Sequence, residues 1–255
     1  MARKGQVHDG HQYITELYES GVRAFLVASL PINIHEMPDA AFLLCSDTLS
    51  ALQELAAFHR QQFDIPVIAI TGSHGKTIVK EWLFHLLSDT FQVVRSPKSF
   101  NSQLGVPLSL LQISDADEIA IIEAAATETG EMQRLTHMIA PTHGIFTNFN
   151  GSPEMIKELV SLFQDAQKVV LPDKYIPVFE PLEKLELIHP GRLETALPDV
   201  IDSTAAKENI ELAYAMAKSV GCSNATLDTA IQSLPSIAMR LERSVGINGC
   251  VLIND

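Results

Sequence analysis

The chain has 255 residues, of which 46% are hydrophobic and 19% are charged, so it is long enough to bury a sizeable core and to form two domains. Its formal net charge of −13 argues against binding to nucleic acid or to an anionic membrane surface, because both need a basic face. No stretch approaches the roughly 18 apolar residues of a membrane-spanning helix, and no signal-peptide pattern follows the first residues. We therefore expect a cytoplasmic protein.

The cysteines are few and do not form a metal-binding pattern. Cys45, Cys222 and Cys250 are isolated in the sequence, odd in number and lack the spacing of metal ligands. We expect three reduced thiols, as in other intracellular proteins.

The first 62 residues have the pattern of a small α/β unit. A helix is expected over 11–20 and another over 47–61, with Asp47 as the N-cap of the second. Between them, strands are expected over 23–29 and 41–45. A change of unit is expected near residue 62, just before the next apolar strand.

The most informative segment is the run of seven residues at 71–77, Thr-Gly-Ser-His-Gly-Lys-Thr. It follows a short β-branched strand at 66–70 and opens an amphipathic helix at 76–88. A strand, a glycine loop and a helix start direct backbone N–H groups and the positive helix end toward phosphate oxygens. Lys76 would then reach the outer phosphates of a nucleotide and the Thr77 hydroxyl would bind Mg²⁺.

The spacing of this loop differs from the usual one. Phosphate loops commonly have four residues between their glycines, whereas Gly72 and Gly75 enclose only two. The alternative interpretation is a helix that merely starts at a glycine turn. The preceding strand and the Gly-Lys-Thr sequence favour a nucleotide-binding loop of a shorter type.

From residue 66 onward, strands alternate with helices, which predicts an α/β fold with a mostly parallel sheet flanked by helices. Strands are expected over 66–70, 91–95, 118–123, 143–147, 168–171 and 185–189. Helices are expected over 76–88, 130–138, 153–164, 205–220 and 224–233. An Asn-Gly turn between β-rich runs predicts a hairpin over 245–253.

Glu123 ends the apolar strand at 118–123, so its carboxylate is expected at the same sheet edge as the glycine loop, where open α/β sheets bind ligands. We interpret it as a Mg²⁺ ligand. The alternative is an ordinary capping or solvated acid.

Several motifs, in order along the chain, resemble those of Mur ligases. They are the loop at 71–77 with Val79-Lys80-Glu81, then Phe100-Asn101-Ser102-Gln103-Leu104-Gly105-Val106-Pro107, then Gly144-Ile145-Phe146-Thr147-Asn148, and Arg240-Leu241-Glu242. Gly130-Glu131-Met132 and Gly105-Val106-Pro107 are similar to the group that adds D-alanyl-D-alanine, and within it to ligases fused to an alanine racemase.

The resemblance implies a domain organisation and a reaction. Residues 1–62 would be part of an N-terminal UDP-substrate-binding domain, residues 63–240 a central ATP-binding domain, and residues 241–255 a hairpin and the start of a linker to a third domain absent here. The family forms an acyl phosphate from a UDP-N-acetylmuramoyl peptide and ATP, and D-alanyl-D-alanine then displaces the phosphate to give an amide. In such a phosphoryl transfer, the protein contributes mainly by stabilising the negative charge on the phosphate oxygens.

The resemblance also implies roles for individual residues. Lys76 and Glu123 would be catalytic, Thr77 and Glu123 would hold Mg²⁺, and Asn101 and Ser102 would lie near the UDP-sugar substrate. ATP would be bound by Gly72, Ser73, His74, Gly75, Lys76, Thr77, Asn209, Arg240 and Asp255. On residue type alone, Asn101 and Ser102 also suit a turn, and Arg240 also suits a surface pair with Glu242.

The chain departs from the family where a second Mg²⁺ would bind. The family carries a His after the Thr-Asn motif and a carbamylated Lys a few residues later; here the His is missing and Leu159 takes the place of the Lys. Leu159 lies on the apolar face of its helix, Lys157 points elsewhere, and His143 and His137 are poorly placed. His74 and Leu212 replace residues that are commonly Asn. We therefore expect nucleotide binding with little or no ligase activity in this chain.

Two other functions stay open at this point. One is a non-catalytic descendant that serves as a scaffold or binding module, which the missing metal ligands favour. The other is a different P-loop ligase, such as a folylpolyglutamate-type enzyme, which the motif at 100–107 fits less well.

Overall fold

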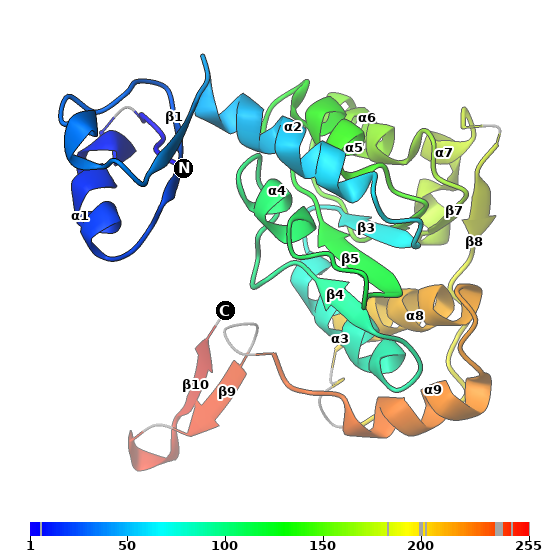
Figure 1. Cartoon of the computed structure of the whole chain (residues 1–255). Coiled ribbons are helices and arrows are strands. Elements are labelled where there is room, and N and C mark those ends of the chain that lie inside the picture. Colours follow the sequence, from blue (N-terminus) through cyan, green and yellow to red (C-terminus); the bar gives the residue numbers. More distant parts are fainter. Residues whose placement is uncertain are drawn as a thin grey trace.

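The computed structural model describes residues 1–5, 7–182, 184–198, 201, 203–237, 242–245 and 247–254. Within this part of the chain, a central α/β body carries a small N-terminal unit on one side, and a C-terminal hairpin lies apart from the sheet (Figure 1).

The central body is built on a parallel six-stranded sheet with the strand order β4-β5-β3-β6-β7-β8. The strands are β3 (Val67–Thr71), β4 (Val93–Arg95), β5 (Ile119–Glu123), β6 (His143–Phe146), β7 (Lys168–Val170) and β8 (Glu186–Ile188). After β3 the chain continues to β4, toward one edge of the sheet. After β6 it continues to β7, toward the other edge. The order therefore reverses between β3 and β6, and such a point is where open α/β sheets bind ligands.

Both faces of this sheet are buried, as a parallel sheet requires. Alternate residues of β3 illustrate the division, because Val67 and Ala69 belong to one hydrophobic cluster while Ile68 and Ile70 belong to the other. The first cluster includes α2 (Thr48–Arg60), α5 (Glu131–Ile139) and α6 (Pro153–Val160), together with the short helices α4 (Gly105–Leu110) and α7 (Ile176–Phe179). The second includes α3 (Lys76–Ser88), α8 (Thr204–Ser219) and α9 (Asn224–Ala230).

Several helices begin where the sequence supplies a capping side chain. Asp47 accepts the Leu49 N–H at 2.9 Å before α2, and Ser152, Ser203 and Ser223 accept N–H groups in the same way before α6, α8 and α9. These caps satisfy donors that the first helical turn leaves without an intrahelical acceptor. Short 3-10 turns Ser161–Phe163 and Ile231–Ser233 extend α6 and α9.

The N-terminal unit is small and has its own core. It comprises a 3-10 turn (Gly10–Tyr13), α1 (Ile14–Glu19) and the parallel strands β1 (Ala24–Val27) and β2 (Ala41–Leu44). Ile14, Phe25, Val27 and Met37 form its buried cluster. The following helix α2, which the sequence analysis groups with this unit, instead buries Ala56 and Ala57 in the cluster of the central body.

The predicted fold class is confirmed, and the expected strands and long helices all form, with end shifts of a few residues. The expected helix over 11–20 is shorter and begins as a 3-10 turn. The expected hairpin forms from β9 (Glu242–Val245) and β10 (Val251–Asn254), which pair antiparallel. The three cysteines are unpaired, as expected. None of the described helices combines the length and apolarity needed to cross a bilayer.

Candidate functional site

The glycine loop lies between β3 and α3, at the point where the strand order reverses. Both of its glycines adopt positive φ, 137° at Gly72 and 86° at Gly75, and Gly75 is the N-cap of α3. A Cβ atom at Gly72 would lie 2.2 Å from Thr147 Oγ1, and one at Gly75 would lie 2.5 Å from Asn209 Oδ1. Backbone conformation and close neighbours therefore both require glycine at these two positions.

The loop is held against the segment that follows β6. The N–H groups of Ser73 and His74 donate to the Asn148 carbonyl at 2.8 and 3.4 Å, and Thr147 Oγ1 donates to the His74 carbonyl at 2.7 Å. Ser73 and Asn150 exchange two further hydrogen bonds. The amides at 73 and 74 are thus already engaged, so the first turn of α3 is the part of the loop whose N–H groups and dipole suit an anion.

Lys76 folds back over the loop. Its Nζ donates to the Gly72 carbonyl at 2.7 Å and to the Ser73 carbonyl at 3.2 Å. The ammonium group consequently lies against the main chain of the loop itself.

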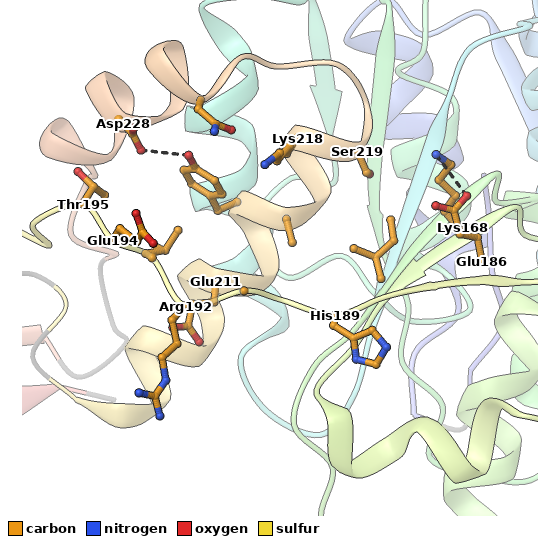
Figure 2. Close-up of a pocket in the computed structure, with 16 residues that line it drawn as sticks. Lys168, Glu186, His189, Arg192, Glu194, Thr195, Glu211, Lys218, Ser219 and Asp228 are labelled. Carbon is orange, nitrogen blue, oxygen red and sulfur yellow. Dashed lines mark hydrogen bonds and ion pairs between the residues drawn. The ribbon is translucent and has the colours of Figure 1, made fainter.

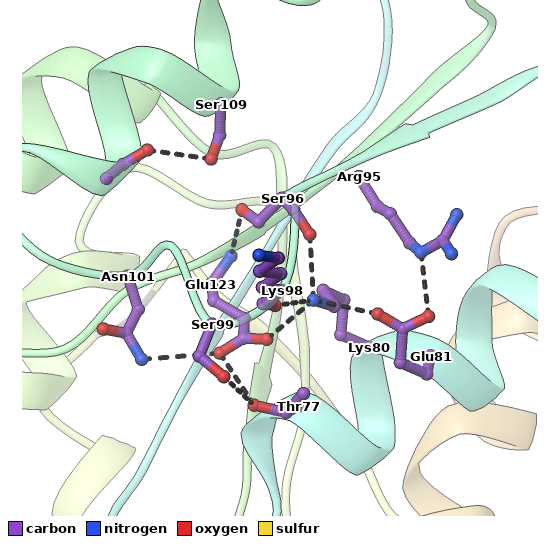
Figure 3. A network of polar contacts seen from close by, with 11 residues as sticks. Thr77, Lys80, Glu81, Arg95, Ser96, Lys98, Ser99, Asn101, Ser109 and Glu123 are labelled. Carbon is purple, nitrogen blue, oxygen red and sulfur yellow. Dashed lines mark hydrogen bonds and ion pairs between the residues drawn. The ribbon is translucent and has the colours of Figure 1, made fainter. Parts of the chain in front are cut away.

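Glu123 and Thr77 meet at the base of the loop. Glu123 ends β5 with its side chain fully buried, and its Oε2 accepts the Thr77 hydroxyl at 3.3 Å and the Asn101 amide at 3.5 Å (Figure 3). Its other oxygen, Oε1, forms an ion pair with Lys80 Nζ at 3.0 Å. A carboxylate and a hydroxyl oxygen side by side are the donors that Mg²⁺ prefers, so these residues fit the metal expected from the sequence.

A cavity of about 340 Å³ opens beside the loop. It brings together residues from the loop, from the segment after β6 and from α8, and includes most of the expected ATP contacts. Its lining is Ser73, His74, Gly75, Lys76, Thr77, Ile78, Asn101, Asn148, Ala205, Glu208 and Asn209. Gly72 is buried beneath this lining. Arg240 and Asp255 lie outside the described residues.

A second cavity, of about 280 Å³, adjoins the first through Asn101. Ser102 and Asn101 line it together with Arg3 from the N-terminal segment and Glu131 from the start of α5. The Ser102 hydroxyl accepts the Gly105 N–H at 3.2 Å, so this residue also supports the start of α4. Asn101 therefore lies between a cavity at the glycine loop and a cavity that reaches the N-terminal unit.

A larger cavity, of about 710 Å³, lies elsewhere and shares no residue with the loop (Figure 2). It lies between β8, the segment after it and α8, and its charged side chains have both signs. Burial, with a hydrogen bond to Asp228, raises the pKa of Tyr214 to about 12, and burial also raises the pKa of Glu211. The smaller cavity contains the glycine loop and the start of α3, which suit phosphate binding, so we take it as the candidate site.

Helix α6 carries Leu159, the position where the family resemblance implies a carbamylated Lys. Leu159 is 4% exposed in the hydrophobic core, which confirms its predicted packing role, and Lys157 is exposed on the opposite side of α6. Among the described residues, no group of three or more His, Cys, Asp or Glu side chains could hold a metal ion. A cation at Thr77 and Glu123 would therefore complete its coordination with phosphate oxygens and water.

Three residues at this site were not predicted to act there. Lys80 contacts Glu123 directly, Asn148 holds the loop through its carbonyl, and Glu208 lines the cavity next to Asn209. Lys80 follows Thr77 by three positions, a helical spacing that could have placed it on the same face. Nothing local in the sequence indicates that Asn148 lies against the loop.

A strand, a glycine loop and a helix at the switch point of a parallel sheet, with a buried carboxylate beside them, define a nucleotide-binding α/β protein. Residues 70–152 match the Mur ligase middle domain. This segment of the chain is therefore similar to the middle domain of Mur ligases, in line with the resemblance of its motifs.

Comparison with curated proteins agrees with this match. The UDP-N-acetylmuramoyl-tripeptide–D-alanyl-D-alanine ligase of Bacillus subtilis is 34% identical over 149 residues, which are 58% of this chain and 32% of that protein. The matched part is thus about a third of the length of this relative.

Solved structures have the same fold. MurF from Acinetobacter baumannii superposes with a TM-score of 0.87 at 21% identity, over 100% of this chain and 63% of that one. MurF ligase from Thermotoga maritima, solved in complex with ADP, gives a TM-score of 0.82 at 20% identity, over 99% of this chain and 66% of that one. At these identities the likeness establishes the fold alone.

Proposed function

We propose that the chain is part of an ATP-dependent amide-bond ligase of peptidoglycan precursor synthesis, which adds D-alanyl-D-alanine to a UDP-N-acetylmuramoyl tripeptide. The observation that carries the proposal is the contact at 3.3 Å between Thr77 Oγ1, in the first turn of α3, and Glu123 Oε2, at the end of β5. The names of the similar proteins support the choice of substrates.

In this proposal the loop binds the triphosphate of ATP. The first-turn N–H groups of α3 and the Lys76 ammonium neutralise the β- and γ-phosphates, while Thr77 and Glu123 hold Mg²⁺. The bound Mg²⁺ supplies positive charge to the phosphate oxygens during transfer. Asn209 contacts the adenine, and Arg240 and Asp255 are proposed to contact the γ-phosphate and the ribose.

The substrate that accepts the phosphoryl group would enter from the second cavity. The carboxylate of the UDP-sugar peptide would pass Asn101 and Ser102 to reach the γ-phosphorus, since Asn101 lines both cavities. Attack on phosphorus breaks the bond to the β–γ bridging oxygen, giving ADP and an acyl phosphate. The amine of D-alanyl-D-alanine then displaces phosphate to form the amide.

We expect this chain on its own to bind nucleotide without ligating. Leu159 lies in the core at the position where the family resemblance implies a carbamylated Lys, which supports loss of the second metal. Removing one group that stabilises charge in a transition state costs about 10²–10³ in rate. We also propose a cytoplasmic location and a fused alanine racemase outside this chain.

The same observation at Leu159 favours a second candidate, a non-catalytic scaffold or binding module with a ligase-like fold. A folylpolyglutamate-type ligase is less well supported: the corresponding Mycobacterium tuberculosis synthase gives a TM-score of 0.62 at 12% identity.

Two measurements separate these functions. For this chain, a thermal-shift titration with Mg-ATP should raise the unfolding midpoint, because a ligand that binds the native state stabilises it. Thr77→Val is the matched variant and should reduce the shift. Absence of a shift at millimolar ATP would exclude the nucleotide-binding function. For the full-length protein, phosphate release that needs both UDP-muramoyl tripeptide and D-alanyl-D-alanine identifies the ligase, and its absence favours the scaffold.

A further inference from the structure

Lys80 is among the largest fully buried side chains of the residues described, and it ends in an ammonium group. Its ammonium group lies 3.0 Å from Glu123 Oε1 and 3.0 Å from Glu81 Oε1, and it donates to the main-chain carbonyls of Ser96, at 2.8 Å, and Lys98 (Figure 3). Four oxygen atoms thus surround one cation with no access to water.

These partners come from separate parts of the site. Lys80 belongs to α3, one turn after the glycine loop, while Glu123 ends β5. Ser96 and Lys98 lie in the segment 96–101 that leads from β4 to Asn101. Lys80 therefore joins the helix that follows the loop to the carboxylate and to the segment that reaches the second cavity.

The contacts of Lys80 determine the direction in which the Glu123 carboxylate points. One carboxylate oxygen faces Lys80, and the other is directed to Thr77 and Asn101. The Glu123 N–H also donates to the Ser96 hydroxyl at 3.1 Å, so the same segment supports the main chain of Glu123. Removal of the ammonium would leave Oε1 without its cation and allow the carboxylate to turn.

The segment 96–101 also depends on Lys80. Lys98 adopts a φ of 48°, in the left-handed region that disfavours residues with a Cβ atom, and its carbonyl accepts the Lys80 ammonium. Such a conformation persists when surrounding contacts determine it. Lys80 supplies two of these contacts, to the carbonyls on both sides of Pro97.

The charges around Lys80 balance. Glu123 and Glu81 carry two negative charges, and Lys80 and Arg95 carry two positive charges, with Arg95 Nε 2.9 Å from Glu81 Oε2. Buried ion pairs often stabilise a fold no better than apolar residues of the same size. Within this balanced network the Lys80–Glu123 pair is fully buried, whereas Glu81 and Arg95 are partly exposed. A buried ion pair beside the nucleotide cavity is therefore better explained by a role in the site than by stability.

We infer that Lys80 is a positioning residue, which fixes the direction of the Glu123 carboxylate and holds segment 96–101 against α3. The inference rests on the proposed function for its link to Mg-ATP, but the contacts that define it exist in the ligand-free chain. They can therefore be tested with and without nucleotide.

The ligand-free test is hydrogen–deuterium exchange in Lys80→Met. The Ser96 and Phe100 N–H groups donate to the Ile121 and Pro97 carbonyls, which gives the segment measurable protection. We expect exchange across 96–101 to become faster by about tenfold or more, with α9 unchanged, because local opening affects only the contacts that are lost. Lys157→Met, the same substitution at an exposed position of α6, should change neither.

The second test measures ATP affinity with and without Mg²⁺ by calorimetry. Lys80→Met should reduce the gain in affinity due to Mg²⁺ by about 10-fold or more, as is typical when a group that orients a metal ligand is lost. ATP affinity without Mg²⁺ should change much less. If the unsubstituted chain shows no Mg²⁺-dependent binding of ATP, the proposed function fails, while the exchange result still decides the role of Lys80.

Lys80→Met could fail to fold because it leaves Glu123 buried without a counter-charge. The double variant Lys80→Met/Glu123→Gln removes both charges at nearly constant volume, and we expect it to fold with fast exchange at 96–101. The inference is overturned if exchange at 96–101 stays slow, if exchange rises uniformly in all segments, or if neither variant folds. If Mg²⁺ raises ATP affinity as much in Lys80→Met as in the unsubstituted chain, Lys80 does not orient the Glu123 carboxylate.

Discussion

The backbone of Gly75 lies directly against the side-chain amide of Asn209, so closely that a Cβ atom at Gly75 would lie 2.5 Å from Oδ1. The two residues come from the start of α3 and from α8, which pack side by side on one face of the sheet. This approach places the residue expected to contact adenine next to the loop expected to bind the phosphates.

Gly75→Ala should therefore displace Asn209 as well as strain the loop. We expect ATP affinity to fall by about tenfold or more, equivalent to losing a well-made hydrogen bond of ~1.4 kcal/mol or more. Gly130→Ala is the matched control, because Gly130 is also a helix N-cap with positive φ, 89°, but a Cβ atom there would have no neighbour within 4 Å. Calorimetry should show the fall in ATP affinity only for Gly75→Ala, while both variants unfold at a lower temperature. Equal ATP affinities would contradict the role of this contact.

Asn209→Ala should separate binding of the base from binding of the phosphates. We expect ATP affinity to fall about tenfold, because a hydrogen bond to the adenine is lost, while inorganic tripolyphosphate binds as before. Asn224→Ala, on α9 beside the cavity of about 710 Å³, should leave both affinities unchanged. Equal losses for ATP and tripolyphosphate would show that Asn209 acts on the loop and not on the base.

Arg60→Met tests a structural contact between α2 and α5. The buried guanidinium donates to the carbonyls of Ile139, Phe63 and Ala140, and burial lowers the pKa of Arg60. Loss of these bonds leaves carbonyls at the end of α5 without donors, so the free energy of unfolding should fall by about 1–3 kcal/mol. Urea denaturation measures the change. Arg134→Met, at an exposed position of α5, should have little effect, and a similar loss in both variants would count against this contact.

His143 should make stability depend on pH below neutrality. Burial, and then the charge of Lys168, lower the pKa of His143 in the folded protein below the value of about 6.5 in the unfolded chain. Between these two pKa values the unfolded chain binds a proton that the folded protein does not, so stability falls as the pH falls from about 7 toward 5.

In thermal unfolding between about pH 7.5 and about pH 5.5, the loss of midpoint temperature should be smaller for His143→Gln than for the unsubstituted chain. His137→Gln, at an exposed position of α5, should retain the full loss. An unchanged pH dependence in His143→Gln would show that this histidine does not contribute.

The sequence predicts most of the central fold because the signals there are local. The β-branched runs of β3 and β5 and the glycine loop before α3 are each contained in a few consecutive residues, and the structure has them where expected. The short helix α4 was missed because Gly105 and Pro107 are unfavourable inside a helix, although Pro107 lies in its first turn, where proline is tolerated.

Contacts between segments that are far apart in the sequence could not be predicted from the sequence. The position of α2 depends on Ala56 and Ala57 meeting the core of the central body, and the same apolar stripe would suit packing within the N-terminal unit. The buried environment of Lys80 likewise depends on Glu123 and Lys98 arriving from other strands and loops. Periodicity gives the face on which a residue lies, but not the element that will cover it.

The hydrogen bonds from the Ser73 and His74 N–H groups to the Asn148 carbonyl affect when the glycine loop reaches its native conformation during folding. The two parts of this contact are far apart in sequence, and the chain between them includes β4 and β5. Contacts between residues so far apart in sequence form late in folding. The chain loses entropy when the long intervening loop closes, and only afterwards does the contact stabilise it. A peptide that contains only β3, the loop and the first turns of α3 would lack this support, so recognition of phosphate should appear only after β6 has joined the sheet.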